Sequence, residues 1–217
     1  MKKIVLLSVT LFLCWHTVLA AAAPAGPKAP KVTVTKENPL FVDLKGRSIS
    51  ILAEVNGKYF HQATRHGVVF SGGSNGEKSI FRSYAKPEDF HAGLMKLGLH
   101  PGNNMTRENG DKTHVQGDLL EVSVTWEGAT RTYSLDEVIP DSNNKPLQIR
   151  FGGNLQNSLQ LKTGCLLCLD SCPVGITSNA NYTMGAVEKR NEVVFKGNSK
   201  LLPPDGSLIV IRIKAKG

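Results

Sequence analysis

The chain has 217 residues and a formal charge of +8, which comes from 26 Lys and Arg against 18 Asp and Glu. This length is typical of one domain with a proper hydrophobic core, or at most of two small domains. The basic residues are scattered, with no Lys/Arg run and no interleaving of basic and aromatic residues. The composition therefore argues against nucleic acid as a partner and favours a solvated basic surface.

Residues 1–20 have the pattern of a secretory signal peptide. Lys2 and Lys3 precede a short apolar stretch over residues 4–14, and Val18-Leu19-Ala20 fits a small-residue cleavage site. The apolar stretch is too short for a membrane-spanning helix, and no later segment approaches the run of about 20 apolar residues that a span needs. We therefore predict a soluble, periplasmic or secreted protein with no membrane span after cleavage.

Residues 21–31 are rich in Ala and Pro and are predicted to form a flexible tether. A single domain is expected over residues 32–217, with its first strand at residues 32–35. In residues 48–60 apolar alternation meets Asn56-Gly57, a pair that tolerates the positive φ angles of a tight turn. This pattern predicts a β-hairpin.

The rest of the chain continues this β-rich pattern. Residues 67–81 predict a second hairpin with a longer glycine-rich connection, and residues 122–135 predict a third around Glu127-Gly128. Further strands are expected at residues 147–151 and at residues 207–214, where the alternation is strong.

One helix is expected from Pro87 to Leu97. Proline suits the first helical position, and Phe90, Leu94 and Leu97 share one face at positions i, i+4 and i+7. Gly98 is a natural stop. The predicted fold class is therefore mainly β in the α+β sense, with antiparallel sheets or hairpins and one or two short helices.

Three segments resemble one known family. TRHGVVFSGGSNGEKSIFRSYAKPEDFHAGLMKLGLHPGNN is similar to the histidine-bearing strand, the short helix and the LG-x-x-PG ending of the YdjY domain family, and RFGGN and SNANYTMGAVEK resemble its C-terminal half. The similarity covers about residues 32–213. It implies a fold but no activity, because the family is essentially uncharacterised. The family also places a histidine at the position of His66. Its members with a cysteine-rich loop resemble those labelled as ferredoxin-type iron–sulfur proteins.

Residues 164–175, GCLLCLDSCPVG, carry the strongest chemical signal of the chain. Cys165, Cys168 and Cys172 lie within eight residues, and a proline follows the last. A bacterial ferredoxin loop has the pattern C-x-x-C-x-x-C-x-x-x-C-P, and here the first cysteine of that pattern falls on Lys162. With Cys14 removed in the signal peptide, one chain cannot complete an iron–sulfur cluster with four cysteines. A three-iron cluster, or a fourth ligand from Asp170, a histidine or a second subunit, would be needed.

Two other interpretations stay open for this loop. A zinc ion needs no assembly machinery, and three cysteines with one histidine would make a Cys3His site. Alternatively, Cys165 and Cys168 form a C-x-x-C pair, which in an oxidising compartment can cycle as a redox dithiol or close as a disulfide. The odd cysteine count then leaves one thiol over.

His61 and His66 flank Arg65, and partly exposed residues at a strand end are the simpler interpretation of this group. Because the family resemblance places a histidine at position 66, His66 is the first choice among the histidines as a metal ligand. The glycine-rich segments at residues 71–76 and 151–154 lack phosphate-loop spacing and are interpreted as turns.

These observations predict an exported accessory or binding module with a three-cysteine site formed by Cys165, Cys168 and Cys172. An iron–sulfur cluster or zinc is the expected cofactor, with electron transfer as one role and a redox or membrane-bound protein as the expected kind of partner. The alternatives are a thiol-disulfide redox protein and a purely structural interaction domain. The sequence contains no hydrolase or transferase motif, so the protein is taken as non-enzymatic by default.

Overall fold

The computed structural model describes residues 34–216. The predicted signal peptide and tether therefore lie outside the described residues, as does half of the strand expected at residues 32–35. The other half, Val34 and Thr35, is not in a strand. Within the described part of the chain, no helix has the length and apolar character needed to cross a membrane.

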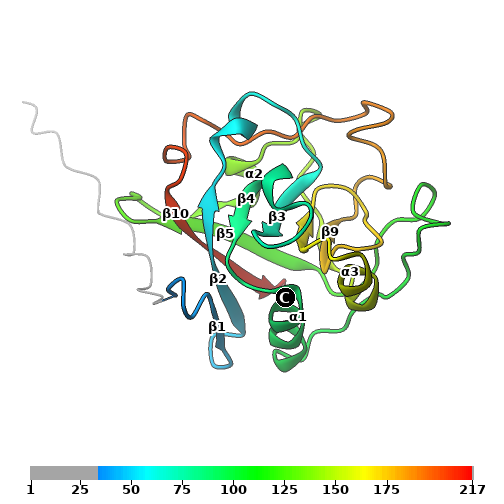
Figure 1. Ribbon diagram of the computed structural model, residues 1–217, viewed down its shortest axis with the longest axis horizontal. Helices are drawn as coiled ribbons and strands as arrows, with labels where there is room; N and C mark the ends of the chain where they lie inside the picture. Colours follow the sequence, from blue (N-terminus) through cyan, green and yellow to red (C-terminus); the bar gives the residue numbers. More distant parts are fainter. Residues whose placement is uncertain (1–33, 217) are drawn as a thin grey trace, which may run out of the picture.

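The strands of the described chain form one curled, mostly antiparallel sheet (Figure 1). Its order is β6-β5-β10-β2-β4-β3-β8-β9-β7, and β1 pairs with β2 off this path. The strands are β1 (Leu40–Asp43), β2 (Ser48–Val55), β3 (His66–Phe70), β4 (Ser79–Ser83), β5 (Leu120–Trp126), β6 (Tyr133–Ser134), β7 (Ile149–Phe151), β8 (Cys165–Cys168), β9 (Thr177–Asn179) and β10 (Leu208–Ala215).

The sheet curls far enough that β7, at one end of the order, contacts β5 near the other end. An isolated antiparallel bridge between Leu119 and Arg150 joins these two regions. The curl encloses the hydrophobic core, which includes Ile49, Phe81 and Phe151, each 0% exposed. The predicted fold class, mainly β with a few short helices in one domain, is confirmed.

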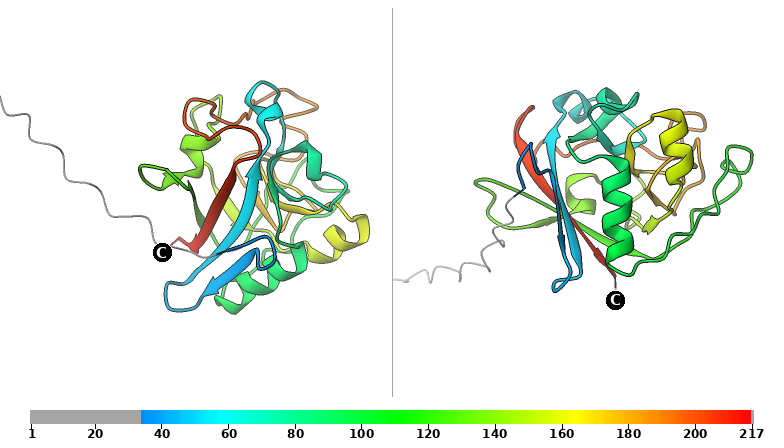
Figure 2. Two further views of the ribbon diagram at one scale, coloured as in Figure 1. Left: turned by 60° about the vertical axis from the view of Figure 1, so that its left-hand side comes forward. Right: turned by 60° about the horizontal axis from the view of Figure 1, so that its bottom comes forward.

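The helical elements are short. They are α1 (Pro87–Lys96), α2 (Leu135–Val138), α3 (Leu155–Leu161) and two 3-10 turns, η1 (Gly57–Phe60) and η2 (Gly76–Lys78). The predicted helix is confirmed as α1, which begins at Pro87 and buries Phe90 and Leu94. Leu97 is also buried but lies just beyond the helix end. Figure 2 shows α1 and α3 side by side, and α1 also contacts β1 and β8.

The hairpin predicted at Asn56-Gly57 is wrong. Asn56 has φ −106°, which is not the positive φ of a tight turn, and the chain continues into η1 instead of a strand. The reason is nonlocal: β2 pairs with β10 along one edge and with β1 and β4 along the other. Both edges of β2 are thereby occupied, so the residues that follow it cannot fold back beside it.

The second predicted hairpin is also wrong in its direction. The strands β3 and β4 are neighbours, as expected, but they run parallel, and η2 lies in the connection between them. The third hairpin is confirmed, since β5 and β6 pair antiparallel around Glu127-Gly128. The strands expected at residues 147–151 and 207–214 are present as β7 and β10.

Candidate metal centre

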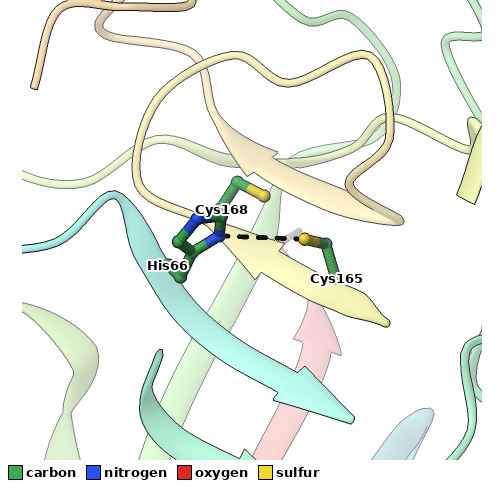
Figure 3. A group of neighbouring side chains, drawn as sticks. All are labelled: His66, Cys165 and Cys168. Carbon is green, nitrogen blue, oxygen red and sulfur yellow. Dashed lines mark hydrogen bonds between the residues drawn. The ribbon is translucent and has the colours of Figure 1, made fainter. Parts of the chain in front are cut away.

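The strands β3 and β8 bring His66 beside the cysteine loop. In their antiparallel ladder His66 lies opposite Cys168, and Val69 lies opposite Cys165. In a regular strand, residues i and i+3 point to opposite faces of the sheet. The register of this ladder shifts twice, between His66 and Val68 and between Val68 and Val69. An irregularity of this kind re-aims side chains, and here both thiols reach the same site (Figure 3).

The three side chains form a compact group. The ligand atoms of His66, Cys165 and Cys168 all lie within 4.8 Å of one another, and His66 Nδ1 is 3.8 Å from Cys165 Sγ. All three residues are buried, with 6% exposure for His66 and 0% for each cysteine. Zinc binds nitrogen and sulfur ligands at about 2.0–2.3 Å, so a small inward movement of these atoms is enough for them to share one ion.

Cys172 belongs to the same cluster. It is 1% exposed and packs with Val69, Cys165 and Cys168. Cys172 is nevertheless not in the group of His66, Cys165 and Cys168 whose ligand atoms lie within 4.8 Å of one another. The three cysteines pack in one buried cluster, and their action as one functional unit stays a prediction.

Side-chain amides fix the loop that carries Cys172. Asn154 Nδ2 donates to the carbonyl oxygens of Cys172 and Gly175 at 3.1 and 3.2 Å, and Asn157 Nδ2 donates to that of Pro173 at 3.0 Å. A Cβ atom at Gly175 would lie 3.1 Å from Cys168 Sγ and 2.7 Å from Ser178 Oγ. A glycine at this position lets the loop approach the sulfur atoms closely.

The three thiols form no disulfide, and their pKa values shift in different directions. Within residues 34–216 the structure contains no disulfide among Cys165, Cys168 and Cys172. Hydrogen bonding from Cys168 lowers the pKa of Cys165, and His66 and Asn75 act in the same direction. Hydrogen bonding from Cys168 also lowers the pKa of Cys172, with help from the positive charge of Arg65. The pKa of Cys168, the shared donor, is raised by its bonds to the other two sulfurs and by burial.

Asp170 is buried beside this group but is not part of it. Its Oδ1 accepts hydrogen bonds from Arg65 Nε at 2.9 Å and Arg65 Nη2 at 2.5 Å, and its Oδ2 accepts one from the Gly185 amide at 3.0 Å. Both carboxylate oxygens are therefore already engaged. The structure places Asp170 in a buried ion pair with Arg65 and leaves it outside the group of atoms that could share a metal.

The histidines differ in burial and in their distance from the cysteines. His66 was expected as a partly exposed strand-end residue, but it is buried because β3 lies inside the sheet between β4 and β8. His61 is exposed after η1, and His91 packs against Phe151 in a tilted arrangement with ring centroids 5.2 Å apart. Of the histidines in the described part of the chain, His66 is the one in the metal-compatible group.

Two residues of the site were missed by the sequence interpretation. Asn75 donates to Cys165 Sγ at 3.6 Å, and Asn154 holds the loop around Cys172. Both lie in the glycine-rich segments that were interpreted only as turns. In both segments asparagine stands next to glycine. This pairing is the sequence signal that could have found them, because close backbone approach often needs glycine.

A family model described as the YdjY domain matches residues 40–214 of the chain. The chain is 52% identical over 181 residues to a protein of Escherichia coli (strain K12) named "Uncharacterized protein YdjY". That match covers 83% of this chain and 80% of the other protein. No solved structure matches the chain significantly.

Proposed function

The chain belongs to the YdjY domain family, and from this premise and the geometry of the buried centre we propose that it is a metal-binding module for a single zinc-like ion. In this proposal His66, Cys165 and Cys168 bind the ion. Cys172 lies outside the 4.8 Å group but packs in the same buried cluster, and it moves inward to become the fourth ligand. The observation that carries this proposal is that three ligand atoms from two neighbouring strands lie within 4.8 Å of one another in the interior.

The donor set supports a single soft or borderline ion. Thiolate and imidazole ligands suit zinc, and three cysteines with one histidine form a common tetrahedral zinc site. An iron–sulfur cluster is ordinarily held by four cysteines, whereas the described chain contains three. A mononuclear ion therefore fits these residues better than a cluster.

The burial of the site supports a structural role for the ion. A catalytic zinc keeps an open position for water or substrate, while a structural zinc is enclosed by protein ligands. Here the three cysteines and His66 are at most 6% exposed. The bound ion then stabilises the junction between β3, β8 and the cysteine loop, and the protein works as an exported accessory module for a partner still to be identified.

A redox dithiol is the competing function. The opposite pKa shifts of Cys165 and Cys168 resemble the asymmetry of a C-x-x-C redox pair. Thiol-disulfide exchange, however, needs a sulfur that a partner's sulfur can reach. Both thiols are fully buried, so the geometry favours metal binding.

Elemental analysis of the mature protein, purified under reducing conditions without an affinity tag that binds metals, tests the proposal. We expect about one zinc ion per chain, and loss of that ion in Cys165→Ser and Cys168→Ser, because removing one thiolate opens the coordination shell. His66→Ala and Cys172→Ser are expected to weaken zinc binding as well. Val69→Ala is the matched control, since Val69 packs in the same buried cluster but has no ligand atom.

Two results would overturn the proposal. Iron with an equal amount of acid-labile sulfide would show a cluster. Metal-free protein that fails to take up added zinc, and whose Cys165 and Cys168 cycle between dithiol and disulfide, would show the redox function.

A further inference from the structure

The glycine-rich segment of residues 71–76 packs directly against the start of β8. The Ser74 amide donates to the carbonyl oxygen of Lys162 at 2.9 Å, and the Asn75 amide donates to that of Thr163 at 3.3 Å. A Cβ atom at Gly73 would lie 2.5 Å from the Thr163 oxygen and 2.6 Å from Gly164 Cα. The segment therefore approaches the backbone before Cys165 more closely than any residue with a side chain at position 73 would allow.

This approach places the side chain of Asn75 on the metal centre. Asn75 Nδ2 donates to Cys165 Sγ at 3.6 Å. The other end of the amide, Oδ1, accepts a hydrogen bond from Lys78 Nζ at 3.1 Å. Since an ammonium group can only donate, Lys78 fixes the orientation of the amide and directs its N–H groups toward the sulfur.

Asn75 is also placed differently from the other neighbours of this sulfur. His66, Val69 and Cys168 are buried, whereas Asn75 is half-buried. It therefore combines two properties: it donates a hydrogen bond to the buried sulfur, and it is itself partly exposed to water.

We propose that Asn75 is a positioning residue of the metal centre, which donates a hydrogen bond to the metal-bound thiolate of Cys165 and retains the ion. This inference rests on the proposed function. Residues that hydrogen-bond metal ligands orient those ligands, and their substitution typically weakens metal affinity about 10- to 100-fold. A donated N–H also stabilises the electron pairs of the sulfur, so it changes the electronic spectrum of a bound transition metal.

The test compares Asn75→Leu, Asn75→Gln and the wild-type protein. Leucine keeps the approximate volume of asparagine but cannot donate, while glutamine retains the amide on a longer side chain. Asn198→Ala is the matched control, because Asn198 is half-buried and donates its amide to the carbonyl oxygen of Glu137 at 3.0 Å, away from the cysteines. Zinc affinity is measured by competition with a chelator, and Co²⁺ is used as a spectroscopic substitute.

In Asn75→Leu we expect zinc affinity to fall by about 10-fold or more. We also expect the sulfur-to-cobalt charge-transfer bands to move to lower energy, because the thiolate loses a stabilising donor. Asn75→Gln is expected to recover part of both effects, and Asn198→Ala is expected to match the wild type.

Two results would overturn the inference, and they are distinguishable. If the wild-type protein binds zinc and Co²⁺ but Asn75→Leu has unchanged affinity and unchanged bands, the role of Asn75 is wrong and the proposed function stands. If the wild-type protein binds neither ion, both the inference and the proposed function are wrong.

Discussion

The ion pair of Arg65 and Asp170 beside the cysteines gives a sharp test of how the loop is held. The Asp170 side chain is 0% exposed and the Arg65 side chain is 13% exposed. Asp170→Ala removes the partner of a largely buried guanidinium and of the Gly185 amide. Leaving such a charge unpaired in the interior costs about 3–5 kcal/mol, much more than the 0–1 kcal/mol typical of an exposed pair.

Urea denaturation of the metal-free protein measures this loss as a change in the free energy of unfolding. The matched control is Glu192→Ala, which breaks the exposed pair of Arg190 and Glu192, whose side chains are 35% and 47% exposed. We expect the control to lose at most about 1 kcal/mol.

A double-mutant cycle with Arg65→Ala separates the pair from the rest of the environment. Because Arg65→Ala/Asp170→Ala leaves no unpaired charge, it is expected to be less destabilised than the sum of the single variants. A loss of less than about 1 kcal/mol in Asp170→Ala, equal to the loss in the control, would refute the reasoning. It would mean that water reaches Arg65 and replaces the carboxylate.

Three further outcomes are expected. Leu94→Ala should lower the free energy of unfolding by about 2–5 kcal/mol because it leaves a cavity under α1. Lys96→Ala, at an exposed position of the same helix, should change it by no more than about 0.5 kcal/mol. Equal losses for the two variants in urea denaturation would contradict the packing of α1. Gly73→Ala should displace the segment of residues 71–76 and lower the free energy of unfolding by about 1–3 kcal/mol. The thiols of the metal-free variant should then react faster with a thiol reagent than those of the wild type. An unchanged rate would show that the close approach of the segment does not protect the thiols. Hydrogen bonds from Arg131 lower the pKa of Glu137 to about 2, so its contribution to stability should be present above about pH 4.5 and lost as the pH falls toward 2. Glu137→Gln should flatten this acid dependence of the urea midpoint, and parallel curves for the two proteins would contradict the assignment.

The sequence alone was sufficient wherever the signal is local. The helix α1 follows from Pro87 and the apolar face of Phe90 and Leu94, and β10 follows from strict alternation. The β5–β6 hairpin follows from Glu127-Gly128 and its flanking strands. The cysteines at positions 165, 168 and 172 lie so close in sequence that their grouping could be predicted without a fold. The family could be inferred in the same way, from residues read in order.

Only the tertiary structure decided what lies beside those cysteines. Cys165 and His66 are 99 positions apart in sequence, and they meet because β3 and β8 pair in a ladder whose register shifts twice. No local pattern encodes that register, since it depends on which strands occupy the neighbouring edges of the sheet. Other pairings in the sheet also go against the local pattern: β3 and β4 run parallel, and both edges of β2 are occupied, so two predicted hairpins failed. Asn75 reaches Cys165 for the same reason: its segment follows β3, and β3 lies beside β8.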